Sequence, residues 1–542
     1  MNDIGQKIIR RYSALKEARG SWESQWREVG DHVLPRKSTF QGGREKGARL
    51  TRRTYDSTPR HANTLLAAAL HGMLTSPSSK WFSLRLRGVP DHIETLPEVS
   101  RWLETAEATI YEELNTPAAG FSSHMHEIYT DLPAFGTAIL FVGENNRSGG
   151  PLFQSRPLSD CVIAENADGI VDTLYRRFTW TVRQTVQQFG KEALSAPLQR
   201  LIDQGEMDKE IGIIHAVFPR EERDHGRRDA RNLPWSSLYV EEESKHLISE
   251  SGYEEMPYMV ARWSKATGET YGRGPAMDAM EDISMLQEMT KTLIRAAQKV
   301  VDPPLQVQDD SALSPVRMAP GALTFRRPGS EPIRPLQTGS NIPIGLEMIQ
   351  AVQQKIYAAF FVDQLQLKES PNMTATEVMA RQEERLRMMG PVLGRLQTEL
   401  LGPLLDRVWG VMWRAGRFME PPEILSGLPL RIEYVSPIAR AQKQIEAQAV
   451  ARVYQFAGPI AQHQPEVMKA INGTKLVRHL SELFGLPPSI LRSERELEKI
   501  KQEEMAMMQQ QQQAMQAQQM LAVGEKMAKI EKTTAEAQAM VQ

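Results

Sequence analysis

The chain has 542 residues, of which 41% are hydrophobic and 24% charged, and its formal net charge is −2. These proportions are typical of a soluble globular protein, and the length predicts about three or four structural units. With a net charge near zero, the chain as a whole does not attract nucleic acid, so any contact with nucleic acid has to come from local clusters of basic residues.

The single cysteine, Cys161, excludes an intrachain disulfide and any zinc site built from several cysteines. We predict that Cys161 is a small buried hydrophobic side chain. His124 and His126 have no further ligand at metal-like spacing, so we interpret both as structural and predict no metal and no cofactor.

The N-terminal segment MNDIGQKIIRRYSALKEARG is charged and lacks the apolar core of a signal peptide. No stretch approaches the roughly 18 consecutive apolar residues that a membrane span needs. We therefore expect a soluble protein made in a reducing compartment, without direct membrane insertion.

The first half of the chain predicts a mixed α+β fold. Residues 1–30 have a helical stripe of apolar side chains, and residues 60–74 form a second helix of small residues. Between them the basic segment 36–53 is interpreted either as a solvated loop or as a phosphate contact. Further helices over 99–130 and short β-like runs over 150–260, separated by turn signals, complete the mixed pattern.

Residues 268–283, GETYGRGPAMDAMEDI, raise the question of a nucleotide site, because a glycine-rich loop entering a helix can cradle a phosphate. The spacing of Gly268, Gly272 and Gly274 fits neither the P-loop, which ends in Gly-Lys-Ser/Thr, nor G-x-G-x-x-G. Pro275 removes a backbone donor that a phosphate nest requires, yet it suits the first position of a helix. The loop is interpreted as a glycine hinge that leads into a helix.

A helix, a compact insert and a second helix follow the hinge. Residues 276–300 have an apolar stripe at helical spacing, and the prolines of VDPPLQV end that helix. Residues 301–343 are rich in proline and glycine. The second helix covers residues 344–367, again with apolar side chains at helical spacing.

The rest of the chain is predicted to be largely helical. A capping box at Thr374 starts a long helix, which Pro391 and Pro403 are expected to kink. The region after 436 is helical as well. Beyond Pro488 the chain has no proline and is rich in Gln, Met, Ala and Glu, which fits either a disordered low-complexity tail or an assembled helical bundle.

Several segments, in their order along the chain, resemble the head-to-tail connector, or portal, proteins of short-tailed phages. They are YDSTPRHANTLLAAALHGMLTSPSSKWF, DLPAFGTAILFV, YEEMPYMVARWSKATGETYGRGPAMDAMEDI, MTATEVMARQEERLRMMGPVLGRL and EYVSPIARAQ. The resemblance is scattered over about residues 20–445, and the C-terminal remainder is poorly covered.

The resemblance implies a mixed α+β, helix-rich subunit with wing, stem, clip and crown, assembled as a homo-dodecameric ring around a central DNA channel. It divides the chain into residues 1–275 as the N-terminal part of the wing, 276–300 as stem helix 1, 301–343 as the clip, 344–367 as stem helix 2, 368–435 as a tunnel loop and long kinked wing helix, and 436–542 as the crown with a helical, barrel-like C-terminal tail. The glycine loop then becomes the bend from wing to stem.

The function that the resemblance implies is passage of the double-stranded DNA genome during packaging and ejection, at one vertex of the capsid in the virion. The implied partners are the large terminase subunit, major capsid and scaffolding proteins, tail adaptor and tubular proteins, and internal core proteins. During assembly the subunits would be in the host cytoplasm.

Basic side chains are the candidate contacts with DNA, which would be independent of base sequence. Lys291, Arg295 and Lys299 recur at i, i+4 spacing, so they share one face of the first stem helix. Lys368 lies where the family places its tunnel loop. The alternative interpretation is that the three helical cations solubilise an outer face.

In the clip, Arg326, Arg327 and Arg334 are candidates for docking the packaging motor or the tail. The alternative is that these are ordinary solvated loop charges, which contribute little to binding or stability.

Two other classes of function compete with a connector. A packaging ATPase needs a Walker A loop, and no Gly-Lys-Ser/Thr sequence occurs at loop spacing. A monomeric DNA-binding module is disfavoured by the near-neutral charge and by the lack of a groove-reading motif. We therefore expect no catalytic residue and no enzymatic activity.

Overall fold

The computed structural model describes residues 2–37, 54–77, 80–86, 96–145, 149–224, 226–227, 229–306, 329, 334–335, 342–365, 388–425, 430–434, 449–450, 452–453, 455–457, 459, 473–484, 496–497, 499–511, 515, 524, 526–527, 529–530 and 533. The predictions for Arg326, Arg327, Lys368 and the capping box at Thr374 fall outside these residues.

The chain forms two compact units. The first comprises Met1–Arg85, Ala106–Glu420 and Pro429–Ala441, and the second comprises Leu86–Thr105, Pro421–Leu428 and Gln442–Gln542. The fold is mixed helix and sheet, as predicted.

The first unit contains most of the regular structure. Its α-helices are α1 (Asn2–Ala18), α2 (Gly20–His32), α3 (Thr58–Leu74), α6 (Phe121–Phe135), α7 (Val182–Phe189), α8 (Ala196–Asp203), α9 (Pro275–Asp278), α10 (Met280–Val301), α11 (Ile342–Ala359), α12 (Val362–Leu365) and α14 (Gly402–Arg414). Short turns of other helical types are η1 (Pro35–Lys37), η2 (Leu158–Asp160) and the π-helical turn η3 (Gln397–Leu401). Helix α5 (Pro97–Asn115) begins in the residues of the second unit and ends in those of the first.

Four sheets accompany these helices in the described residues. The larger ones have the strand orders β3-β2-β9 and β4-β5-β6-β7-β8, and the smaller ones pair β1 with β12 and β10 with β11. The strands are β1 (Phe82–Leu86), β2 (Thr137–Glu144), β3 (Pro151–Arg156), β4 (Cys161–Glu165), β5 (Val171–Thr181), β6 (Glu210–Pro219), β7 (Trp235–Glu241), β8 (Leu247–Tyr253), β9 (Tyr258–Arg262), β10 (Leu305–Gln306), β11 (Arg334–Pro335) and β12 (Leu430–Tyr434).

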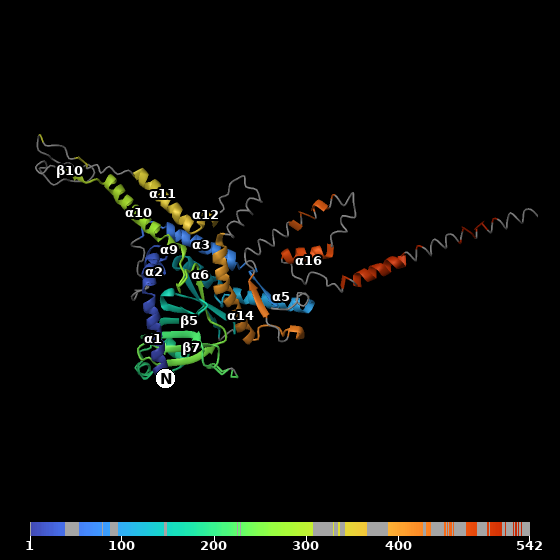
Figure 1. Ribbon diagram of the computed structural model, residues 1–542, viewed down its shortest axis with the longest axis horizontal. Helices are drawn as coiled ribbons and strands as arrows, with labels where there is room; N and C mark the ends of the chain where they lie inside the picture. The colour runs from blue at the N-terminus through green and yellow to red at the C-terminus, as the bar shows by residue number, and fades with distance from the viewer. Residues whose placement is uncertain are drawn as a thin grey trace, which may run out of the picture. The chain divides into compact units, whose positions relative to one another are not determined.

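Helix α1 covers one face of the five-stranded sheet (Figure 1). Its apolar stripe buries Ile8 and Tyr12 against Ile214 and Val240 of the sheet. A four-residue repeat of this kind places side chains on one face of a helix, which is why the stripe was readable in the sequence.

Arg19 separates helix α1 from helix α2, and its side chain is 1% exposed. Its Nε donates to Glu23 at 2.8 Å, and its Nη atoms donate to the backbone carbonyls of Leu158, Ser159 and Cys161. A buried guanidinium is tolerated only with such partners. No sequence pattern indicated this contact, because three of the four partners of Arg19 lie about 140 residues away.

Cys161 is buried, as predicted. Burial raises the pKa of its thiol to about 12. The thiol is therefore protonated at neutral pH, and it behaves as the small apolar side chain that the sequence indicated.

Helix α6 runs directly into the buried strand β2. Pro133 lies inside the helix, and Gly136 ends it in the left-handed region with φ 68°. Glycine adopts this φ without a steric cost, and it is the usual residue after a helix. A single glycine therefore separates the helix from the buried strand.

The predicted helix over 276–300 is present as α9 and α10, with a break at Ala279. Gly274 precedes Pro275, which is the first residue of α9, as its fixed φ favours. The predicted second helix over 344–367 is also divided, since Phe361 has φ 58° between α11 and α12. Both departures are local and leave the helix–insert–helix order intact.

The described part of the predicted long helix covers residues 388–414 and contains η3. This π-helical turn lies just before Pro403. Proline has no N–H, and its ring clashes with the carbonyl four residues earlier, so a widened turn there accommodates it. The kinks predicted at Pro391 and Pro403 stay predictions.

The second unit is described only in part. It contains the short helical turn η4 (Glu423–Leu425) and helix α16 (Gly473–Phe484), and residues 499–511 are helical, with 501–511 exposed. The assembled C-terminal bundle stays a prediction, as does the division into wing, stem, clip and crown.

Candidate nucleic-acid interface

Helices α10 and α11 lie side by side in the first unit and are joined by the segment that includes β10 and β11 (Figure 1). The two helices approach closely at Gly345, because a Cβ there would lie 3.0 Å from a methyl group of Leu293. Towards the rest of the unit, α11 buries Ile349, Val352 and Ile356.

The base of the helix pair is fixed by polar contacts with residues 55 and 56. The side-chain oxygen of Gln287, on α10, accepts hydrogen bonds from the backbone N–H groups of Tyr55 at 2.7 Å and Asp56 at 3.0 Å. Gln353, on α11, donates to the Asp56 carboxylate at 2.8 Å. One short segment therefore clamps both helices where they leave the body of the unit.

The three predicted cations of α10 differ in their surroundings. Lys291 is half-buried, its Nζ lies 2.7 Å from Glu288, and the Tyr55 ring centroid is 5.9 Å away. Arg295 and Lys299 are exposed, and neither forms an ion pair with any residue that the structure describes. The positive potential of this face is therefore greatest at its C-terminal half, where cations also complement the helix dipole.

A pocket of about 390 Å³ lies beside Lys291. It is lined by His32, Tyr55, Ser284, Gln287, Glu288 and Lys291. The one lysine of the lining is paired with Glu288 of the same pocket, so it is not an isolated positive charge.

At the far end of the helix pair, β10 and β11 form a two-residue antiparallel ladder, with Leu305 opposite Pro335 and Gln306 opposite Arg334. Arg334 is exposed there. The ladder brings the two ends of the predicted clip together, as expected for an insert that leaves one helix and returns to the next.

The glycine bend before α9 is packed tightly. A Cβ at Gly272 would overlap the carbonyl oxygen of Gly136, and a Cβ at Gly274 would overlap that of Pro133. The N–H of Gly272 donates to Thr137 Oγ1 at 2.9 Å, and the N–H of Arg273 donates to a backbone carbonyl. These two donors are occupied, so the segment does not offer the free N–H groups of a phosphate nest.

Gly268 differs from the other glycines of the bend. Its φ is 86°, and nothing lies within 4 Å of the position where a Cβ would be. Gly272 and Gly274 are required for close backbone approach, whereas Gly268 is required for its backbone conformation. That this bend acts as a hinge between the predicted wing and stem stays a prediction.

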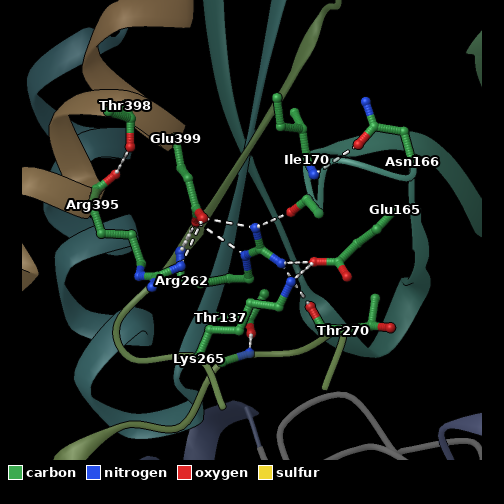
Figure 2. Close-up of polar contacts among 12 residues, drawn as sticks. Thr137, Glu165, Asn166, Ile170, Arg262, Lys265, Thr270, Arg395, Thr398 and Glu399 are labelled. Carbon is green, nitrogen blue, oxygen red and sulfur yellow. Dashed lines mark hydrogen bonds and ion pairs between the residues drawn. The ribbon is translucent and has the colours of Figure 1, made fainter. Parts of the chain in front are cut away.

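A buried arginine fixes this bend to two other parts of the unit (Figure 2). Arg262, the last residue of β9, is 2% exposed. Its Nε and Nη2 donate to the Glu399 carboxylate at 3.0 Å and 2.7 Å, and Nη1 pairs with Glu165. Two further donations reach the carbonyls of Gly169 and Thr270, at 3.1 Å each.

Each of these two carboxylates has a second cation. Lys265 lies 2.5 Å from Glu165, and Arg395 lies 3.2 Å from Glu399 (Figure 2). The cluster thus joins β4, β9, the glycine bend and η3. It is a structural network that no short motif indicated, because Arg262 and Glu399 are 137 residues apart.

The described residues contain no group of three or more His, Cys, Asp or Glu side chains placed to hold a metal ion. His124 lies 3.6 Å from Glu127, and the His126 ring centroid is 5.6 Å from that of His71. None of the described helices has both the length and the hydropathy needed to cross a membrane.

Comparison with known proteins identifies the family. Residues 5–491 match the family model described as bacteriophage head to tail connecting protein. The chain belongs to this family of phage connectors. The resemblance drawn from the sequence is thereby confirmed.

Two phage proteins are similar to this connector over nearly its whole length. A probable portal protein of Bordetella phage BPP-1 is 31% identical over 509 residues, which are 92% of this chain and 90% of the relative. The portal protein of Salmonella phage epsilon15 is 30% identical over 545 residues, which are 98% of this chain and 96% of the relative. The connector is a phage portal and a component of the phage particle.

Among solved structures, a chain from the virion of a native gene transfer agent particle aligns with 78% of this connector and 94% of its own length. The TM-score of this alignment is 0.36 and the sequence identity is 12%.

Proposed function

We propose that the connector assembles as a homo-dodecameric ring around a channel through which double-stranded DNA is packaged into the capsid and later ejected. Family membership over residues 5–491 supports a connector between head and tail. The observation that supports the channel is the helix pair α10–α11, which is clamped at its base and has exposed cations on α10 without an ion-pair partner among the described residues.

In this proposal the domain division inferred from the sequence applies, with α10 and α11 as the stem and residues 301–343 as the clip. The ring occupies one capsid vertex, with subunits in the host cytoplasm until assembly. Its partners are the major capsid and scaffolding proteins, the large terminase subunit, tail adaptor and tubular proteins, and internal core proteins. The connector itself has no catalytic role, and DNA translocation is driven by the motor.

The ring is tested by electron microscopy and by mass measurement of the purified protein. We expect closed rings with a central hole and a mass about twelve times 61.2 kDa. A uniform monomer at high protein concentration would contradict the proposal, and a monomer that hydrolyses ATP would favour a motor instead.

Because the three cations of α10 differ in exposure and ion pairing, we expect their substitutions to impair DNA packaging to different degrees. The double substitution Arg295→Gln/Lys299→Gln should lower the yield of filled heads more than Lys291→Gln, because Lys291 is already paired with Glu288. Each neutralised residue removes one band of positive charge from the ring, which weakens attraction to phosphates at any base sequence. The measurement is packaged DNA per assembled head.

Lys291→Gln is the matched control on the same helix, and ring formation should be unchanged in all these variants. Normal numbers of stably filled heads from the double variant would contradict a role of this face in the channel. Lys368→Gln tests the tunnel-loop proposal by the same measurement, and undiminished packaging would contradict it.

Arg334, together with Arg326 and Arg327, is proposed to dock the terminase and then the tail. Charge reversal by Arg334→Glu should weaken binding of the large terminase subunit to purified rings, because a rim charge chiefly affects association between proteins. Binding is measured by co-sedimentation. Arg295→Glu, on the stem helix, is the control and should leave this interaction intact; equal binding by Arg334→Glu and wild type would refute the docking role.

A further inference from the structure

The two larger sheets of the first unit meet along a row of polar side chains. Strand register aligns Cys161, Arg176, His215 and Tyr239 across β4 to β7, so the four side chains share one face of the five-stranded sheet. His215 Nδ1 lies 2.8 Å from the hydroxyl of Tyr258, on β9. This face is therefore turned towards the three-stranded sheet.

Each sheet contributes one half-buried arginine to this region. Arg176, on β5, has its guanidinium carbon 4.4 Å from the Phe178 ring centroid. Arg156, on β3, has its guanidinium carbon 5.1 Å from the centroid of Phe141, whose ring in turn lies 6.5 Å from that of His215. The two guanidinium groups thus approach the same inter-sheet region from opposite sheets.

Neither arginine has a carboxylate partner in the described part of the chain. The Nε of each is buried and has no hydrogen-bond acceptor, and Arg156 Nη2 donates to Gln154. The neighbouring Arg177 shows the usual arrangement, since its Nε lies 2.7 Å from Glu242. Buried N–H donors are normally hydrogen-bonded, so two Nε–H groups without an acceptor in one region indicate that an acceptor binds there.

The charges of the two arginines shift the pKa values of neighbouring groups. Burial and the charge of Arg176 lower the pKa of Arg156, and burial together with both arginines lowers the pKa of His215 to about 3. Asp160 is the nearby carboxyl, but it makes no ion pair with either arginine, and burial raises its pKa. Like charges therefore lie close together with incomplete compensation.

We propose that Arg156 and Arg176 form a binding site for a small tetrahedral oxyanion such as inorganic phosphate. A guanidinium presents its N–H groups as a fork that fits an oxyanion, and charge-assisted bonds of this kind are strong. A bound anion supplies acceptors for the two Nε–H groups, and its negative charge offsets the repulsion between the two guanidinium groups. A water molecule would supply an acceptor but no negative charge. The anion would join β3 to β5 and so hold the two sheets together.

The site is separate from the DNA-contacting face proposed on α10. Both arginines are half-buried, and they lie where two sheets meet, so a duplex backbone has no access comparable to that at the exposed Arg295. A free oxyanion is much smaller than a duplex, which is why we assign the site to one.

The test is calorimetric titration of assembled wild-type rings with sodium phosphate, at neutral pH and constant ionic strength in chloride. We expect saturable binding of one phosphate per chain. Arg156→Gln and Arg176→Gln should each weaken binding by roughly tenfold or more, the effect of losing a charge-assisted hydrogen bond. Arg177→Gln is the matched control, because this residue follows Arg176 on β5 and is paired with Glu242; its affinity should equal that of wild type.

Folding of each variant is checked by circular dichroism. Arg176→Lys, which keeps the charge but loses the fork, provides a conservative variant that should bind with intermediate affinity.

No saturable binding to wild type, or unchanged affinity in Arg156→Gln and Arg176→Gln, would overturn the proposal. Displacement of phosphate by a short DNA duplex would also overturn it and reassign the site to backbone phosphates. Ring formation is scored separately by microscopy, so failure of the anion site leaves the connector function untouched.

Discussion

Alanine in place of Gly272 should destabilise the first compact unit by about 3 kcal/mol or more, as expected when a side chain is forced into closely packed backbone. The added Cβ would overlap the carbonyl oxygen of Gly136 and lie 2.9 Å from the Cβ of Arg262 and 3.0 Å from the carbonyl oxygen of Ser264. Two of these three atoms are backbone oxygens, which cannot rotate away as the end of a side chain can. Chemical unfolding followed by circular dichroism measures the loss.

Gly72→Ala is the control for this substitution. Gly72 lies within α3, and nothing is within 4 Å of an added Cβ. Alanine there should stabilise the fold by about 0.5–1 kcal/mol, because glycine has the greater conformational entropy in the unfolded chain. Equal stability of Gly272→Ala and wild type would show that the bend is loosely packed.

Arg262→Met should destabilise the fold by about 3–5 kcal/mol, the range for breaking a buried ion pair from one side. The substitution leaves Glu165 and Glu399 half-buried with one cation each, Lys265 and Arg395, so we expect the lower part of that range. It also removes the donors to the Gly169 and Thr270 carbonyls. The free energy of urea unfolding is the quantity to compare.

A second change in the same cluster separates charge from packing. Glu399→Gln in the Arg262→Met background should cost less than Glu399→Gln alone, because the residue it would have paired with is gone. Lys7→Met, which breaks the exposed Lys7–Asp3 pair, should change stability by no more than about 0.5 kcal/mol. Additive losses in the cycle would show that Arg262 and Glu399 are not coupled.

Sequence patterns predicted the parts of the fold that depend on neighbours along the chain. Apolar residues at helical spacing indicated α1, α10 and α11, and proline and glycine marked where helices begin and end, as at Pro275. The pattern did not reveal the break at Ala279 or the left-handed residue Phe361. Neither residue is a typical helix breaker, so local propensity favoured a continuous helix.

The buried arginines Arg19 and Arg262 could not be predicted from the sequence. An isolated arginine is normally exposed, and only its partners make burial possible. The backbone carbonyls that accept from Arg19 lie about 140 residues away, and Glu399, which pairs with Arg262, lies 137 residues away, so the fold has to be known before these contacts can be assigned. The basic face of α10 was readable from spacing, but the pairing of Lys291 with Glu288 was not singled out.

The chemistry of Cys161 makes this connector convenient for site-specific labelling. It is the only cysteine of the chain, and it is buried and protonated, with a thiol pKa of about 12. The thiolate is the species that attacks a maleimide, so the native chain, whose only thiol is buried and protonated, should react slowly. A fluorophore or spin label on an introduced cysteine, for example Arg334→Cys or Lys299→Cys, would then report on that position alone. Distances between labels on neighbouring copies could be measured without first removing a native thiol.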